Sequence, residues 1–117
     1  MREVSPPSEL MKLKHDVYGQ VVLQLEKDFT LSGISIDLSA ARAPEVMWQM
    51  LLSTLDDLLK NDPESLRNLL YRVDLNEAMV NAMVLEKKET DFLQELALQL
   101  IAREIKKILN RLKQRLD

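Results

Sequence analysis

Apolar residues recur at helical spacing near the beginning of the chain. From residue 10 to residue 29 they fall every three or four positions, which places them on one face of a helix. Ser8 follows two prolines and is suited to the N-cap, so we expect a first helix of about 20 residues. Residues 17–31 also show some alternation of period two, and Gly19 lowers helix propensity. A partial hairpin within residues 17–38 is therefore the alternative.

The stretch near residues 31–43 departs from the helical pattern. It contains Gly33, after which Ile34, Ile36 and Leu38 alternate with polar residues. Such alternation of β-branched and polar residues is typical of extended chain. We expect an extended connector near residues 31–43 whose three apolar side chains hold it to the core.

Two prolines indicate where the next helices begin. Pro44 suits the first turn of a helix that runs to about Lys60, and its apolar positions cover an arc of roughly 200°, wide enough for a central helix. Asp62 and Pro63 have the pattern of an N-cap followed by the first helical residue. Asp74, three residues before a Glu, resembles a capping box and predicts another short helix to about residue 84.

The last predicted helix is the longest. It runs from Asp91 to about Arg115, with Thr90 as a cap and no Gly or Pro to interrupt it. Its apolar residues change direction midway, so its two halves face different neighbours. The later direction is shared by large aliphatic side chains, here called the aliphatic stripe: Leu98, Ile101, Ile105, Ile108, Leu109, Leu112 and Leu116.

These patterns predict an all-α fold. We expect a compact bundle of about five helices, with the extended connector near residues 31–43 and a long C-terminal helix. One domain spans residues 1–117, with residues 1–7 as a flexible arm. The chain has only two glycines and no cysteine, which excludes a β-sandwich or barrel, a disulfide scaffold and Cys-based metal sites.

Charge is distributed unevenly along the chain. The net charge is −3, but residues 102–117 carry six Lys or Arg against two Asp or Glu, while residues 1–101 carry ten against seventeen. The terminal segment is therefore at +4 and the rest at −7. Its cations, here called the basic face, are Arg103, Lys106, Lys107, Arg111, Lys113 and Arg115. This face supports the alternative function, that of a regulatory protein that contacts nucleic acid or an anionic membrane through the C-terminal helix.

Few residues of the sequence are suited to catalysis. His15 is the single histidine, and its neighbour Asp16 points to a different helix face. No acidic cluster has the spacing of a calcium loop or a di-iron bundle. We therefore expect no catalytic residues, no cofactor or metal, and no small-molecule substrate. The absence of a targeting segment, a long apolar run and cysteine favours the cytoplasm.

The aliphatic stripe is the strongest local feature of the sequence. A small domain whose last helix turns its apolar face midway cannot bury both directions against one neighbour, so we expect the whole aliphatic stripe to be left for a partner, because monomers avoid such patches. We therefore predict a homodimer that forms through the C-terminal helix, most simply with two-fold symmetry. The expected function is a non-enzymatic interaction or assembly module, with an additional protein partner as a further option.

Two short boxes carry a resemblance. The first, residues 69–77, reads Leu-Leu-Tyr-Arg-Val-Asp-Leu-Asn-Glu, and the second, residues 103–107, reads Arg-Glu-Ile-Lys-Lys. The chain resembles a group of small, uncharacterised, all-helical bacterial proteins that pair a Leu-Tyr-Arg-Val/Ile-Asp box with a C-terminal Arg-Glu-x-x-Lys helix. The resemblance implies an all-helical fold and transfers no functional residue.

The first box also has an interpretation from its residues alone. Tyr71, Arg72 and Asp74 form a polar junction between two predicted helices. Arg72 is favourable at a helix C-terminus, and Asp74 is placed to cap the next helix. A polar contact from this junction to a partner is the functional alternative.

Overall fold

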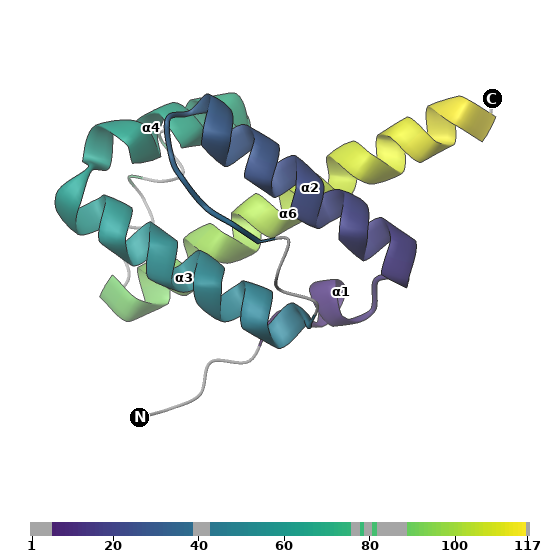
Figure 1. Cartoon of the computed structure of the whole chain (residues 1–117), viewed down its shortest axis with the longest axis horizontal. Coiled ribbons are helices and arrows are strands. Elements are labelled where there is room, and N and C mark those ends of the chain that lie inside the picture. Colours follow the sequence, from purple (N-terminus) through teal and green to yellow (C-terminus); the bar gives the residue numbers. More distant parts are fainter. Residues whose placement is uncertain (1–5, 39–42, 76–77, 79–80, 82–88, 117) are drawn as a thin grey trace.

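Helices arranged around one buried core make up the described chain in the computed structural model (Figure 1). The structure describes residues 6–38, 43–75, 78, 81 and 89–116, and the side chains of residues 92–115 within the last of these ranges. The helices are α1 (Ser8–Met11), α2 (His15–Leu31), α3 (Pro44–Asn61), α4 (Pro63–Arg72) and α6 (Glu89–Leu116). No strand occurs in these ranges, so the predicted all-α class is confirmed.

The predicted first helix is in fact two helices. Residues 12–14 separate the single turn of α1 from α2, and Pro7 rather than Ser8 holds the N-cap position of α1. In one straight helix Leu10 would lie about 16 Å along the axis from Val21, beyond the core. The break turns α1 back beneath the start of α2 (Figure 1), and Leu10 is only 1% exposed.

The hairpin alternative is wrong, because residues 15–31 are helical. Helix α2 ends in a Schellman motif, in which Gly33 has a φ of +85°. The Gly33 amide donates to the Thr30 carbonyl at 3.1 Å, and the Ile34 amide donates to the Phe29 carbonyl at 2.9 Å. These two bonds close the helix end and direct the chain into the connector.

The described part of the connector is extended, as predicted. Ile34 and Leu38 are buried and Ile36 is half-buried, so all three hold the segment to the core. The Leu38 amide donates to the Glu26 carboxylate of α2, which adds a polar attachment. Residues 39–42 lie outside the described residues.

The beginnings of α3 and α4 agree with the sequence pattern. Pro44 and Pro63 occupy the first turns of their helices. Asp62 caps α4, because its Oδ1 accepts a hydrogen bond from the Ser65 amide at 3.2 Å. The short helix predicted to about residue 84 falls largely outside the described residues. The predicted Thr90 cap is wrong, because α6 already includes Glu89 and Thr90 lies within the helix.

Helix α6 is the element that joins the fold together. It packs against both α2 and α3, and Figure 1 shows it passing behind them before its C-terminal end projects from the body. Because neighbours lie on two sides of α6, its apolar residues can change direction midway and still be buried within one chain. The long C-terminal helix of the prediction is therefore confirmed.

Candidate binding surfaces of the C-terminal helix

The aliphatic stripe of α6 is largely covered within the chain. Ile101 and Ile108 are 0% and 1% exposed, and they belong to the core of the monomer. Leu98, Ile105 and Leu112 are half-buried and pack against that core. The expectation that the whole stripe is left for a partner is therefore wrong, because α2 and α3 together cover both directions of the helix.

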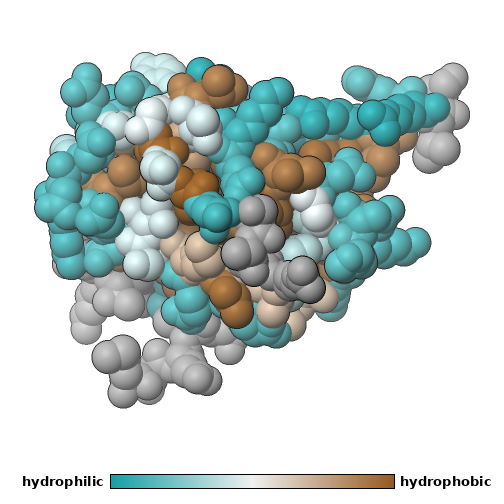
Figure 2. Space-filling view, viewed as in Figure 1, coloured by the Kyte–Doolittle hydropathy of each residue, from teal (hydrophilic) through white to brown (hydrophobic). Residues whose placement is uncertain are grey.

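Part of the stripe stays at the surface where α6 leaves the body. Leu109 is 49% exposed, and the half-buried Leu112 follows three residues later. Figure 2 shows hydrophobic surface along one side of the projecting end and hydrophilic surface along the other. The side chain of Leu116 lies outside the described ones. Among its described side chains, the most exposed member of the stripe, Leu109, thus lies where the helix leaves the body.

The polar junction closes α4 by a second Schellman motif. The Asp74 amide donates to the Tyr71 carbonyl at 3.1 Å, and the Leu75 amide donates to the Leu70 carbonyl at 2.9 Å. Asp74 itself has a φ of +62°, a left-handed conformation in which Asp is tolerated better than most residues. Asp74 therefore ends α4, and the amides that it was predicted to cap lie outside the described residues.

The Asp74 side chain turns toward α6. Its Oδ2 lies 2.8 Å from Nη2 of Arg103, and Nε of the same guanidinium donates to the Val73 carbonyl at 3.3 Å. The polar junction and the basic face, which are about 30 residues apart in sequence, therefore meet in space. Asp74 is highly exposed, so the ion pair itself contributes at most about 1 kcal/mol, but it orients Arg103.

A hollow of about 210 Å³ lies at this meeting point. Its described lining residues come from the end of α4 and from one face of α6, and they are Arg72, Val73, Asp74, Arg103, Lys106, Lys107 and Asn110. Asn110 belongs to this surface although the sequence analysis did not select it. The other basic-face residues, Arg111, Lys113 and Arg115, are exposed farther along α6 and do not line the hollow.

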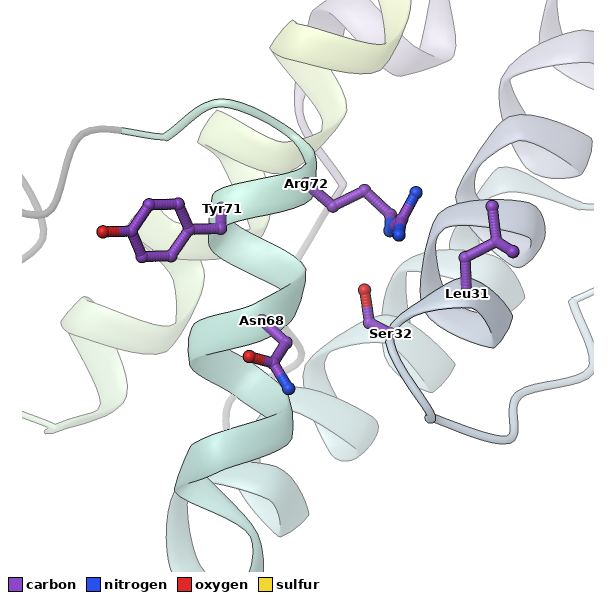
Figure 3. A pocket seen from close by; sticks show the side chains of 5 residues that line it. All are labelled: Leu31, Ser32, Asn68, Tyr71 and Arg72. Carbon is purple, nitrogen blue, oxygen red and sulfur yellow. The ribbon is translucent and has the colours of Figure 1, made fainter.

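Arg72 also borders a second, shallower depression of about 500 Å³ beside the end of α2. Figure 3 shows Arg72 extending from α4 toward Ser32, while the Tyr71 ring points away from α2. Tyr71 is 74% exposed. The three residues of the polar junction thus have different surroundings, and only Arg72 and Asp74 reach the basic hollow.

A buried polar cluster lies beneath the hollow, between α2 and α6. Nζ of Lys107 donates to Oδ2 of Asp28 at 3.2 Å and lies 3.6 Å from Oε1 of Glu104. Gln24 donates to the other oxygen of Asp28 at 3.3 Å. Asp28 and Glu104 are both buried, and the Glu104 side chain is 0% exposed.

Burial raises the pKa of Glu104 from 4.5 to about 8, and the hydrogen bond and negative charge of Asp28 add to the effect, while Lys107 opposes it. Neither Glu104 oxygen has a hydrogen-bond donor among the described residues. Protonation of Glu104 supplies a hydrogen bond, because one of its oxygens then becomes a donor toward Asp28. Glu104 is therefore neutral at pH 7.

The position of Glu104 in the sequence already indicates this cluster, although Glu104 is not among the predicted site residues. Glu104 stands three residues after Ile101 and four before Ile108, so it occupies a position of the buried stripe. A carboxylic acid at such a position requires a partner within the core. Because Glu104 and Asp28 are buried, the cluster holds α2 to α6, and only Lys107 extends from it to the hollow.

The described residues include no group of three His, Cys, Asp or Glu side chains placed to hold a metal ion. Across the described part of the chain, every helix is too short or too polar to cross a membrane.

The chain matches no family model, no curated protein and no solved structure. The resemblance to small bacterial proteins therefore stays a prediction.

Proposed function

We propose that the protein is a non-enzymatic helical interaction module of the cytoplasm that forms a homodimer through the projecting end of α6. The observation that carries this proposal is the exposure of Leu109, at 49%, on a helix end that leaves the body of the molecule. An apolar side chain held out in this way gains free energy when a second helix covers it.

The spacing of the aliphatic residues supports helix pairing. Ile105, Leu109 and Leu112 are separated by four and three residues, which is the spacing of a coiled-coil seam, and Leu116 continues it by another four. Ile105 and Leu112 already contact the core on one side, so they anchor the start of the seam. A second copy of the same helix has the complementary surface.

Charge complementarity also favours a second copy as the occupant. The helix end belongs to the segment at +4, whereas residues 1–101 are at −7. In a two-fold antiparallel pairing the two basic helix ends point away from each other, so each faces the remainder of the other copy, whose net charge is negative. Two parallel helix ends side by side would instead repel each other.

The oligomeric state tests this proposal directly. We expect the wild-type protein to sediment as a dimer at micromolar concentration and Leu109→Glu to sediment as a monomer. Leu23→Glu is the matched control, because Leu23 is also an exposed leucine, at 63%, but lies on α2. A wild-type monomer, or equal dissociation by both variants, would overturn the proposal.

A second candidate function rests on the basic side of the same helix end. Lys106, Arg111, Lys113 and Arg115 are all exposed, and the hydrophilic side of the projection is visible in Figure 2. Such a surface suits nucleic acid or an anionic membrane. Binding to either one should collapse between about 50 and 200 mM salt, because phosphate contacts release counterions.

A further inference from the structure

We propose that the basic hollow between α4 and α6 binds the phosphoryl group of a small phosphate monoester. This site differs from the dimer surface, because it lies within one copy of the chain. It also differs from the basic face as the sequence defines it, since Arg72 and Asn110 take part while Arg111, Lys113 and Arg115 do not.

The donors of the hollow converge from two helices. Arg103, Lys106, Lys107 and Asn110 follow one another at i, i+3, i+4 and i+7, so they share one face of α6. Arg72, the last residue of α4, borders the hollow from the other side, with its side chain extending toward the end of α2 (Figure 3). Residues from the end of α4 and from one face of α6 thus border one space, as an anion with several oxygen atoms requires.

Two of the cations are already held in place. The guanidinium of Arg103 uses two of its five N–H donors for Asp74 and Val73, and the remaining donors are free for a ligand. Lys107 is held by Asp28 and Glu104. Ordering these two side chains is therefore part of folding and costs little on binding.

The other two cations supply the uncompensated charge. Arg72 and Lys106 have no ion-pair or hydrogen-bond partner among the described residues, although both border the hollow. The lining of the hollow holds four cations and one carboxylate, that of Asp74, so its net charge is +3. The buried carboxylate of Asp28, which contacts Lys107, lowers this net charge to +2. This positive charge balances the charge of a phosphate monoester at pH 7, which is about −1.5 to −2.

The size of the hollow favours a small ligand over a polymer. Its volume of about 210 Å³ corresponds to about seven water molecules in the liquid. This space accommodates a phosphoryl group and the atoms next to it. A nucleic acid or a membrane would instead use all exposed cations of the helix, including those beyond the hollow.

Paired double variants test the site by isothermal titration calorimetry with phenyl phosphate and, separately, inorganic phosphate. Arg72→Gln with Lys106→Gln removes two charges at the hollow, and Arg111→Gln with Lys113→Gln removes two charges outside it. All four side chains are exposed, so both proteins should fold, which thermal melting by circular dichroism checks. We expect saturable binding of phenyl phosphate that weakens about tenfold or more in the first variant only.

The arms of the experiment separate the possible ligands. Competition by inorganic phosphate with similar affinity would identify free phosphate as the source of the group, whereas preference for phenyl phosphate would identify a monoester. Absence of saturable binding at about 10 mM of either probe, or equal weakening in both variants, would overturn the site. Tighter binding of a single-stranded oligonucleotide that depends equally on all four cations would also overturn it.

The dimer proposal and this site can fail separately. Leu109→Gln removes the apolar contact without adding a charge and leaves the lining of the hollow unchanged, so it should bind phenyl phosphate like the wild type. A loss of binding in that variant would contradict a site built within one copy.

Discussion

Glu104 is expected to make the stability of the protein depend strongly on pH. The groups that face its carboxyl group are Asp28 on α2 and Lys107 on α6, and Gln24 donates to Asp28 from the same helix. The variant that isolates Glu104 is Glu104→Gln. Glutamine has nearly the same shape, it cannot become charged, and its amide can donate to Asp28 as the protonated acid does.

The expected magnitude follows from the pKa of Glu104, which is about 8 in the folded protein against an ordinary value of 4.5. Between these values the folded state holds one proton more than the unfolded state, so stability falls by about 1.4 kcal/mol for each pH unit gained. Below pH 4.5 the neutral Glu104 makes its full contribution to the free energy of unfolding, and above pH 8 this contribution is lost. The total loss is about 5 kcal/mol, and about 3 kcal/mol is already lost at pH 7.

Urea unfolding at a series of pH values measures this effect. We expect Glu104→Gln to match the wild type at about pH 4.5 and to exceed its free energy of unfolding by about 3 kcal/mol at pH 7. The difference between the two proteins cancels the titration of the groups that do not contact Glu104. Glu9→Gln is the control, because it makes the same change of side chain at an exposed position.

Two results would refute this reasoning about Glu104. One is a difference between the wild type and Glu104→Gln that stays constant from pH 4.5 to pH 8, since that would mean that the group has the same protonation in both states. The other is a variant less stable than the wild type at pH 7, since that would make the charged carboxylate the stabilising form.

Two further predictions concern the core and the glycines. Ile108→Glu should abolish cooperative thermal unfolding by circular dichroism, because it buries a charge without a partner. Leu109→Glu should keep a cooperative transition, at a temperature lowered only by the loss of the dimer contact; equal loss of cooperativity in the two variants would contradict the burial pattern of α6. Gly19→Ala should stabilise the protein by about 0.5–1 kcal/mol and Gly33→Ala should destabilise it by about 1 kcal/mol in urea unfolding. An added Cβ meets no atom within 4 Å at either position, but only Gly33 has a positive φ, of +85°; effects of the same sign would contradict this account.

Local interactions explain which parts of the fold could be predicted. Helix periodicity, the prolines at the starts of α3 and α4, and the Asp62 cap act within a few residues of each other, so the sequence indicates them directly. The extended connector follows from the alternation around Ile34 and Ile36 for the same reason. The break at residues 12–14 could not be predicted, because it depends on where Leu10 finds the core.

The candidate sites depended more on contacts between distant residues. The sequence selected Arg72, Asp74 and the cations of α6 separately, and only the tertiary fold, which brings the end of α4 to Arg103, joined them around one hollow. It also indicated a stripe on α6 without showing which of its members the chain itself would cover. Asp28 and Lys107 are 79 residues apart, so no local pattern could pair them.

The sequence alone was sufficient for the all-α class, the helix starts and the concentration of positive charge after residue 101, because each of these follows from neighbours within one or two helical turns or from composition. The tertiary structure decided that Ile101 and Ile108 belong to the core, that Leu109 stays at the surface, and that Glu104 is buried beside Asp28. The physical reason is that exposure and pKa depend on which helix covers which face, and α6 is covered by two helices that precede it by many residues.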